Sequence, residues 1–283
     1  MRTTIQLFTR ILLLLLVMIA PAILVEGKRE LFNGNYGNAS PSSSQIIINR
    51  FMTFSVSASA VCARSAEMAE AQHQAALKAE FKLFVIEAAY IYEDMDLASS
   101  GLSRKAFEYA WVGYHKLQKK GMIHRSGILS ICDFSQSSSQ ERMYVIDVRK
   151  KKLLFRTYVA HGINSGEQFA NSFSNSPESC KSSLGFYVTQ RTYTGINGLS
   201  LRIDGVDKGF NDMASRRNIV IHGAPYVSRH ILEKYGVMGT TFGCPAIPTE
   251  MTGQIIPMVK NGSCFFIYYP SKKYLAQSAV LNG

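Results

Sequence analysis

The stretch Ile219-Val220-Ile221-His222-Gly223 is an apolar, β-branched run that ends in a histidine. Such a run is typical of a buried strand, so it predicts an imidazole at a strand end. A second stretch, Gly239-Thr240-Thr241-Phe242-Gly243-Cys244-Pro245-Ala246-Ile247-Pro248, places a thiol directly after a glycine. A thiol and an imidazole together suit nucleophilic acyl transfer, because the imidazole raises the thiolate fraction. The two stretches therefore predict a cysteine acyl-transfer site.

Short β-rich runs surround these two stretches and predict a mostly β catalytic domain over residues 122–283. The predicted strands cover residues 143–148, 153–159, 185–189, 199–203, 219–222 and 264–269. A short helix is expected over about 249–260, and polar loops are expected at 135–140 and 171–183. Together with the helices described next, this pattern indicates an α+β fold.

A helical region precedes the strands. Residues 65–94 are rich in Ala, Glu, Lys and Leu, and apolar residues then recur at helical spacing from Leu102 to Leu117, with a stop at Gly121. We expect residues 65–121 to pack on the catalytic domain, because the aromatic side chains at this spacing indicate core rather than a ligand site.

The first 64 residues carry two different signals. Residues 11–25 form an uncharged apolar run preceded by Arg2 and Arg10, which predicts a signal peptide over residues 1–25, with an uncleaved membrane anchor as the alternative. Residues 26–64 start with a Ser-, Asn- and Gly-rich stretch and predict a flexible linker. We therefore expect an exported protein of the periplasm or cell envelope.

Composition limits the classes of partner. The 283 residues carry a formal charge of +11, and 47% of them are hydrophobic, which suits a globular chain that adsorbs to anionic surfaces. No Lys/Arg stripe alternates with aromatics, so we expect no nucleic-acid binding. The densest basic run, residues 149–152, is interpreted as a solvated hairpin turn. The oligomeric state is left open.

Five cysteines are an odd number, so at least one is unpaired within the monomer. Cys264 and Cys132 lie in apolar runs and are interpreted as packed strand residues, whereas the pairing of Cys180 and Cys62 is left open. Histidines and cysteines show no short metal-ligand spacing, and we expect no metal site and no organic cofactor.

Several ordered motifs between Glu87 and Tyr269 resemble the murein L,D-transpeptidase catalytic-domain group, a branch of the YkuD-type L,D-transpeptidases. The motifs that carry the resemblance are residues 101–103, 107–110, 158–162, 182–187, 220–223 and 243–246. The resemblance implies an exported bacterial enzyme with a mostly β domain that acts on peptidoglycan stem peptides.

The resemblance also assigns roles to residues. Cys244 would attack a tetrapeptide stem, expel D-Ala and hold the stem as a thioester, with His222 as base. The Gly223 carbonyl would orient the imidazole, and Gly243 with Cys244 would supply N–H groups to the oxyanion. Transfer to an amine would give a cross-link, and transfer to water would give L,D-carboxypeptidase or amidase activity.

Candidate substrate-binding residues are His161, Ser183, Tyr187 and Arg202. Alternatives stay open for each: His161 lines the cleft or caps a strand, and Arg202 clamps a carboxylate or pairs with Asp204. Ser183 and Tyr187 are placed near the cleft by the resemblance alone.

Three positions depart from the family pattern. The broader family usually has histidine at position 242 and arginine or asparagine at position 246, where this chain has Phe242 and Ala246, and close relatives often carry arginine where Thr240 stands. These departures leave the nucleophile intact but change the expected substrate contacts. A non-catalytic wall-binding protein is therefore a further alternative, in which Cys244 is a structural thiol.

Overall fold

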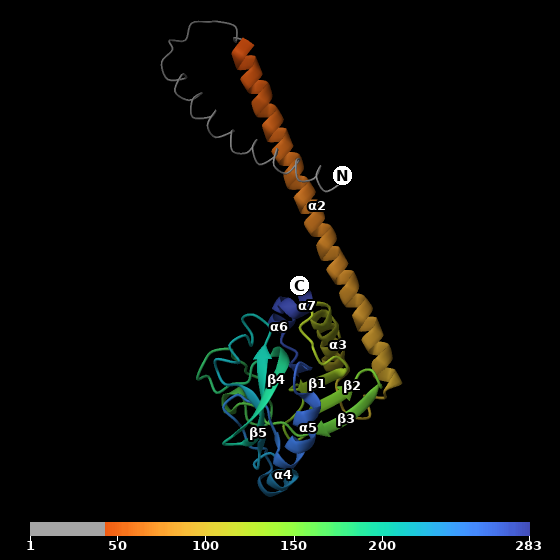
Figure 1. Cartoon of the computed structure of the whole chain (residues 1–283), viewed down its shortest axis with the longest axis vertical. Coiled ribbons are helices and arrows are strands. Elements are labelled where there is room, and N and C mark those ends of the chain that lie inside the picture. The colour runs from red at the N-terminus through yellow and green to blue at the C-terminus, as the bar shows by residue number, and fades with distance from the viewer. Residues whose placement is uncertain (1–42) are drawn as a thin grey trace. The chain divides into compact units, whose positions relative to one another are not determined.

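The computed structural model describes residues 43–283, which contain one eight-stranded sheet and the helices around it (Figure 1). The mostly β domain preceded by helices confirms the predicted fold class. The predicted signal peptide or anchor at residues 1–25, and the first part of the predicted linker, lie outside the described residues. No helix within residues 43–283 combines the length and apolarity needed to cross a membrane.

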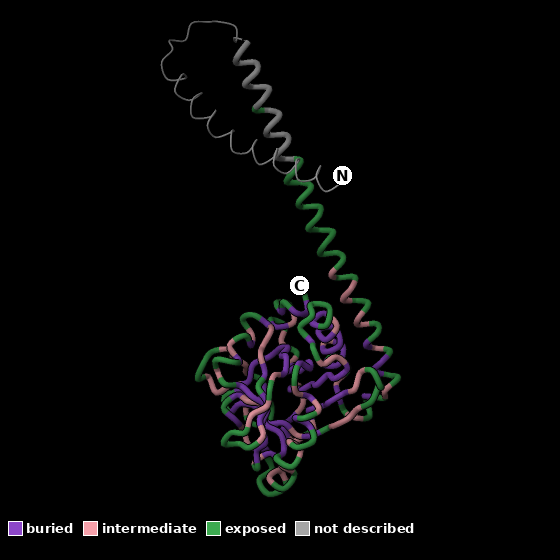
Figure 2. The backbone as a smooth tube through the Cα atoms, in the orientation of Figure 1, coloured by how far each residue is buried: buried purple, intermediate pink, exposed green. Residues whose placement is uncertain are grey.

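Helix α2, Ser43–Asp94, begins earlier than the sequence indicated. We expected a flexible linker up to residue 64, but residues 43–64 are helical. The prediction relied on missing apolar periodicity, and a helix rich in small residues can form without an apolar face. Residues 61–76 are exposed throughout, as Figure 2 shows. The described residues up to Met68 belong to one unit, and residues 69–283 form a second.

The sheet has the strand order β3-β2-β1-β8-β4-β5-β6-β7. Its strands are β1 Ile128–Asp133, β2 Met143–Asp147, β3 Lys152–Thr157, β4 Gly185–Gly195, β5 Gly198–Gly205, β6 Val220–Ala224, β7 Ala246–Pro248 and β8 Cys264–Tyr268. The pairs β1/β8 and β6/β7 are parallel, and all other neighbours are antiparallel. Strand β7 was not predicted, because a three-residue run ending in proline gives no strand signal.

The basic run at residues 149–152 joins β2 to β3, as predicted. Asp147 Oδ1 accepts hydrogen bonds from the backbone N–H groups of Arg149 and Lys150 at 3.1 and 2.9 Å. A short acid that caps its own turn in this way closes the hairpin. The basic side chains are exposed, although Lys151 pairs with Asp94 and Arg149 donates to Ser126 Oγ.

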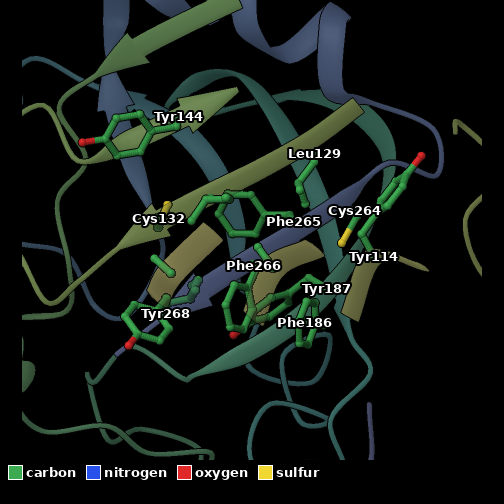
Figure 3. Close-up of a cluster of buried hydrophobic side chains, with 14 of the residues drawn as sticks. Tyr114, Leu129, Cys132, Tyr144, Phe186, Tyr187, Cys264, Phe265, Phe266 and Tyr268 are labelled. Carbon is green, nitrogen blue, oxygen red and sulfur yellow. The ribbon is translucent and has the colours of Figure 1, made fainter. Parts of the chain in front are cut away.

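The core is built from aromatic residues on β4 and β8 (Figure 3). The Phe186 and Phe266 rings stack with their centroids 4.1 Å apart. Gly113 of helix α3 (Arg104–Lys119) lies directly over this pair, because a Cβ at Gly113 would come within 2.0 Å of the Phe186 ring. Cys132 and Cys264 are fully buried in neighbouring strands, which confirms them as packed strand residues.

Helix α3 links the preceding helix to the sheet. Ser103 Oγ caps its first turn by accepting from the Ala106 N–H, the usual role of serine at this position. Trp111 Nε1 donates to Glu87 of α2 at 3.2 Å, and the Phe84 ring stacks on His115 at 5.0 Å. Since α3 also contacts β1 and β8, residues 84–92 are tied to the sheet through it.

The remaining helices are short. They are η1 Ile163–Ser165, α4 Arg229–Tyr235, η2 Thr249–Met251, α5 Thr252–Val259, α6 Lys272–Gln277 and α7 Ala279–Asn282. The predicted helix over 249–260 is confirmed as η2 and α5. Buried Asp207 fixes the last two helices, since its carboxylate accepts from Tyr274 Oη at 2.8 Å and from Ser278 Oγ at 2.6 Å.

Candidate active site

The parallel pair β6/β7 brings His222 and Cys244 to the same edge of the sheet. His222 pairs with Ala246, so the register continued by two residues sets Cys244 beside Val220. The Val220 backbone lowers the pKa of the Cys244 thiol, which agrees with this placement. Residues that are 22 positions apart in sequence number are therefore neighbours across two strands.

The His222 ring is held in one tautomer. Its Nδ1 lies 2.9 Å from the Gly223 carbonyl oxygen, and because a carbonyl only accepts, Nδ1 carries the hydrogen. Nε2 is then the nitrogen that can take a proton. Gly223 itself has no room for a side chain, since a Cβ there would come within 2.7 Å of the Thr252 methyl group.

The Cys244 side chain is half-buried, and its thiol is a hydrogen-bond donor. Its Sγ donates to the Asn218 carbonyl at 3.8 Å. Burial raises the pKa of the Cys244 thiol, and the Val220 N–H and the Arg217 guanidinium partly offset that rise. A thiol in this environment requires a base before it can act as a nucleophile.

The turn that presents Cys244 depends on Gly243. Gly243 has φ +120, and a Cβ there would come within 2.7 Å of the Lys181 carbonyl oxygen, so only glycine fits. Thr241 Oγ1 accepts from the Gly243 N–H at 3.0 Å and donates to the Cys244 carbonyl at 2.7 Å. The Gly243 N–H is thus engaged, whereas the Cys244 N–H makes no hydrogen bond to any residue of the described chain.

A second segment, residues 160–163, holds this turn from the other side. The Thr241 N–H donates to the His161 carbonyl at 2.9 Å, and the Ile163 N–H donates to the Thr241 carbonyl at 2.7 Å. Ser182 Oγ accepts from the Gly162 N–H at 3.0 Å and donates to the Gly243 carbonyl at 3.4 Å. The predicted motifs at 158–162 and 182–187 therefore meet around Gly243.

His161 is fully enclosed and supports this segment. Its Nδ1 lies 2.7 Å from Arg142 Nη2, and its Nε2 lies 2.9 Å from the Gly166 carbonyl. Since the guanidinium only donates and the carbonyl only accepts, His161 is neutral with hydrogen on Nε2. Burial, followed by the Arg142 charge, lowers the pKa of His161 to about 4. Both ring nitrogens are therefore bonded to groups of the protein itself.

Ser183 and Tyr187 are also buried and bonded to each other, with 2.8 Å between their hydroxyl oxygens. Arg217 Nη1 donates to Ser183 Oγ at 3.3 Å and to the Ser174 carbonyl at 2.8 Å, and its Nη2 donates to the Lys181 carbonyl at 2.5 Å. Ser183 and Tyr187 therefore lie in the interior, where Ser183 contacts Arg217.

Arg202 is placed differently, on the exposed side of β5. Ser200 pairs with His222 and Arg202 pairs with Val220, so Arg202 and His222 share one face of the sheet. The Arg202 guanidinium stacks on the Tyr193 ring at 4.8 Å. Among the ion pairs within residues 43–283 none joins Arg202 to Asp204, although both line one pocket of about 350 Å³.

The departing positions occupy distinct environments. The side chain of Phe242 is 79% exposed next to the nucleophile, whereas Ala246 is fully buried opposite His222. Helix α4 lies in the chain between His222 and Cys244.

Two residues of the site were not predicted. Arg217 and Asn218 directly precede the predicted strand at residue 219, and both contribute to the environment of Cys244. The only signal for them was a basic pair, Arg216-Arg217, immediately before an apolar run that ends in the proposed base.

The described residues contain no group of three or more His, Cys, Asp or Glu side chains arranged to hold a metal ion. All five cysteines, including Cys62 and Cys180, are free thiols. At the edge of β6 and β7 the Cys244 thiol and the His222 imidazole lie beside backbone amides.

Comparisons with known proteins fall on the same domain. The family model of the L,D-transpeptidase catalytic domain matches residues 98–268. No protein in a search of curated proteins matches the chain. Among solved structures, L,D-transpeptidases from Mycobacterium smegmatis and Mycobacterium tuberculosis match at 12% and 15% identity, with TM-scores of 0.32 and 0.30. Each alignment covers 50% of this chain, and 59% and 58% of those chains respectively.

A further structure, an L,D-transpeptidase from Xylanimonas cellulosilytica, matches at 13% identity with a TM-score of 0.30, covering 57% of this chain and 80% of that one. The match of the family model covers more than half of the sequence and contains every residue of the site described above. This chain belongs to the L,D-transpeptidase catalytic-domain family.

Proposed function

We propose that this protein forms a thioester between Cys244 and a peptidoglycan stem peptide and passes the acyl group to an amine. The observation that carries the proposal is the fixed tautomer of His222, whose Nδ1 is held by the Gly223 carbonyl 2.9 Å away. That contact leaves Nε2 of His222 free to act as a base. His222 lies on β6 and pairs with Ala246, two residues after Cys244.

In the proposed reaction, His222 Nε2 takes the proton of the Cys244 thiol, which otherwise donates to the Asn218 carbonyl, and the sulfur attacks the carbonyl carbon of the scissile amide. The C–N bond breaks, the amine leaves with the proton from His222, and the acyl group stays on sulfur. The Cys244 N–H is our candidate oxyanion donor, because the Gly243 N–H is bonded to Thr241. The sequence predicted two oxyanion donors, the N–H groups of Gly243 and Cys244, and our proposal keeps only the Cys244 N–H.

The second half-reaction returns the thiol. An amine attacks the thioester, the C–S bond breaks as an amide forms, and the amine proton passes through His222 to the sulfur. Water in place of the amine would make the protein an L,D-carboxypeptidase or amidase. We favour the amine, since an exposed Phe242 next to Cys244 offers an apolar surface to an incoming peptide.

Intact-protein mass spectrometry with a defined tetrapeptide muropeptide tests the proposal. We expect an adduct on the parent protein, no adduct on Cys244→Ala, and an acylation rate lower by about 10²- to 10⁴-fold in His222→Gln. An adduct that persists in Cys244→Ala would overturn the assignment. Absence of any adduct on the parent would favour a non-catalytic wall-binding protein, and loss of D-Ala without cross-linked dimers would favour hydrolysis.

A further inference from the structure

The part of α2 that belongs to the second unit, residues 69–94, has apolar side chains on two opposite sides. One side packs against the domain through Phe81, Phe84, Val85, Ala88 and Ile91. The other side presents Leu83, Ile86 and Tyr90, which are 66%, 67% and 66% exposed. Figure 2 shows exposed and partly buried positions alternating along this part of the helix. A helix that is apolar on all sides is normally buried on all sides, so the exposed side of α2 suits a partner.

The exposed side follows a heptad spacing. Between residues 69 and 90, exposed residues recur at alternating intervals of three and four, and all but one of them are apolar: Ala69, Gln72, Ala76, Ala79, Leu83, Ile86 and Tyr90. We call this set the α2 seam. Apolar residues that alternate in this way over about three heptads are typical of a coiled coil, in which the same positions of two helices interlock. The pattern therefore indicates another helix as the partner.

The charges beside the α2 seam indicate which helix fits it. With Leu83 at heptad position a, Lys82 is at position g and Glu87 is at position e. Both are exposed, and Lys82 forms no ion pair with any residue of 43–283. In two parallel helices in register, position g faces position e of the following heptad, which brings Lys82 to the second copy's Glu87. Antiparallel pairing would instead set Glu80 and Glu87, both at position e, against acids. The α2 seam is therefore complementary to itself in the parallel orientation.

Charge also argues against a lipid surface as the partner. Residues 69–94 contain five acids and two lysines, although the whole chain has a formal charge of +11. Helices that lie on anionic membranes normally carry Lys and Arg along their polar face. This part of α2 is acidic within a basic protein, so it suits a protein partner better than anionic lipid.

We infer that two copies of this chain associate through a parallel, in-register pair of α2 seams. Leu83, Ile86 and Tyr90 pack against the same residues of the second copy, and Lys82 pairs with the second copy's Glu87. The domain does not block this pairing, because it contacts the opposite side of the helix. The inference goes beyond the proposed acyl transfer and does not depend on it.

Sedimentation equilibrium of the full-length chain measures the association. We expect a concentration-dependent dimer, and Ile86→Glu should raise its Kd at least tenfold, because the substitution places a charge in an apolar contact. Ile196→Glu is the matched control, since Ile196 is fully exposed between β4 and β5, and its Kd should stay within about twofold of the parent. Circular dichroism checks that both variants are folded. Equal Kd values for the two variants would overturn the inference.

A monomeric parent would also overturn the inference. Flotation with phosphatidylglycerol vesicles then identifies the alternative partner. Binding of the monomer that Ile86→Glu abolishes would assign the α2 seam to lipid rather than to a second copy.

Charge variants test the orientation. Lys82→Glu should raise the dimer Kd more than Lys82→Gln does, because it sets an acid against the second copy's Glu87. Adding Glu87→Gln to both variants should remove this difference. Glutamine keeps an oxygen that can accept from Trp111 Nε1, so the contact between α2 and α3 is retained. A difference that persists with Glu87→Gln would contradict the parallel, in-register arrangement.

Cross-linking measures the orientation independently. Ala76→Cys and Tyr90→Cys are made separately in a Cys62→Ser, Cys180→Ser, Cys244→Ser background, in which the remaining native thiols are fully buried. The two positions lie about 21 Å apart along the helix. In a parallel, in-register dimer each position cross-links with itself through a short bis-maleimide, whereas an antiparallel dimer allows this at one position at most. Self-cross-linking at one position alone would overturn the parallel arrangement.

Discussion

Arg142 Nη2 donates to His161 Nδ1 across 2.7 Å in the interior of the protein, so a buried cation fixes a buried imidazole in its neutral form. The other Arg142 donors reach the Val159 and Gln136 carbonyls, and its guanidinium lies 4.6 Å from the Phe134 ring centroid. The segment that holds the Cys244 turn is thereby anchored on the Arg142 charge, with which no carboxylate of residues 43–283 forms an ion pair.

This arrangement predicts acid lability. Burial and Arg142 lower the pKa of His161 to about 4, below its value in the unfolded chain, so the unfolded state binds more protons between that value and about 6.5. The stabilisation is complete above about pH 6.5 and is lost as the pH falls toward 4, by up to about 3 kcal/mol. Urea unfolding at pH 7.5, 5.5 and 4.5 measures the loss. His161→Gln should show a smaller pH dependence than the parent over this range.

The Cys244 environment predicts an alkaline shift in thiol reactivity. Burial raises the pKa of Cys244, and Arg217 opposes the rise. Alkylation by iodoacetamide should therefore reach its half-maximal rate above the pH typical of a free thiol. Arg217→Gln should move that midpoint to still higher pH, and Arg217→Lys should move it less. The measurement uses a Cys62→Ser, Cys180→Ser background, since these two thiols are not fully buried. A midpoint that Arg217→Gln lowers would contradict the assignment.

Gly243→Ala should abolish acylation. The added Cβ would meet the Lys181 carbonyl oxygen at 2.7 Å in a backbone conformation that L side chains rarely adopt, so the Cys244 turn must move. We expect a loss of at least about 100-fold in the acylation rate, since a displacement of about 1 Å has effects of this size. Gly209→Ala is the control, because Gly209 also has positive φ but has nothing within 4 Å of its Cβ position. Similar activity in the two variants would show that the turn tolerates the change.

Asp207→Ala should destabilise the protein without touching the thiol. The substitution leaves the Tyr274 and Ser278 hydroxyls and the Phe186 N–H without their acceptor in the interior. We expect a loss of more than about 3 kcal/mol in the free energy of unfolding, because stranded buried donors cost about 1–3 kcal/mol each. Asp212→Ala, at an exposed position, should cost much less. Guanidinium unfolding followed by circular dichroism distinguishes the two.

The sequence predicted six of the eight strands, β2 to β6 and β8, because each of them shows its own local pattern. The assignment of Cys244 and His222 to the site depends on local pattern in the same way and remains a prediction. The apolar composition of residues 219–221 indicates a buried strand. The glycine and proline on either side of Cys244 indicate a thiol outside a regular strand. The contacts of Arg217 could not be predicted in the same way. They are made to backbone carbonyls of a loop more than thirty residues earlier, and no local pattern encodes such a partner.

His161 shows the opposite limit. A strand followed by His-Gly is the same local pattern at residues 161 and 222, yet one imidazole is enclosed by Arg142 and Gly166 and the other is held through Gly223. Only the packing of β2 and the loop after it distinguishes them. The length of α2 before residue 65 escaped prediction for a related reason, since a helix without an apolar face lacks the periodic signal on which the prediction relied.

Gly223 joins two requirements in one residue. Its carbonyl sets the direction of the His222 ring, and its missing side chain makes room for the Thr249–Thr252 turn that starts α5. Gly223 therefore determines both the position of α5 and the orientation of the imidazole that we propose as the base. A substitution that loosens η2 or α5 would therefore misalign the His222 imidazole. Such a substitution would lower activity even at a residue that does not contact the substrate.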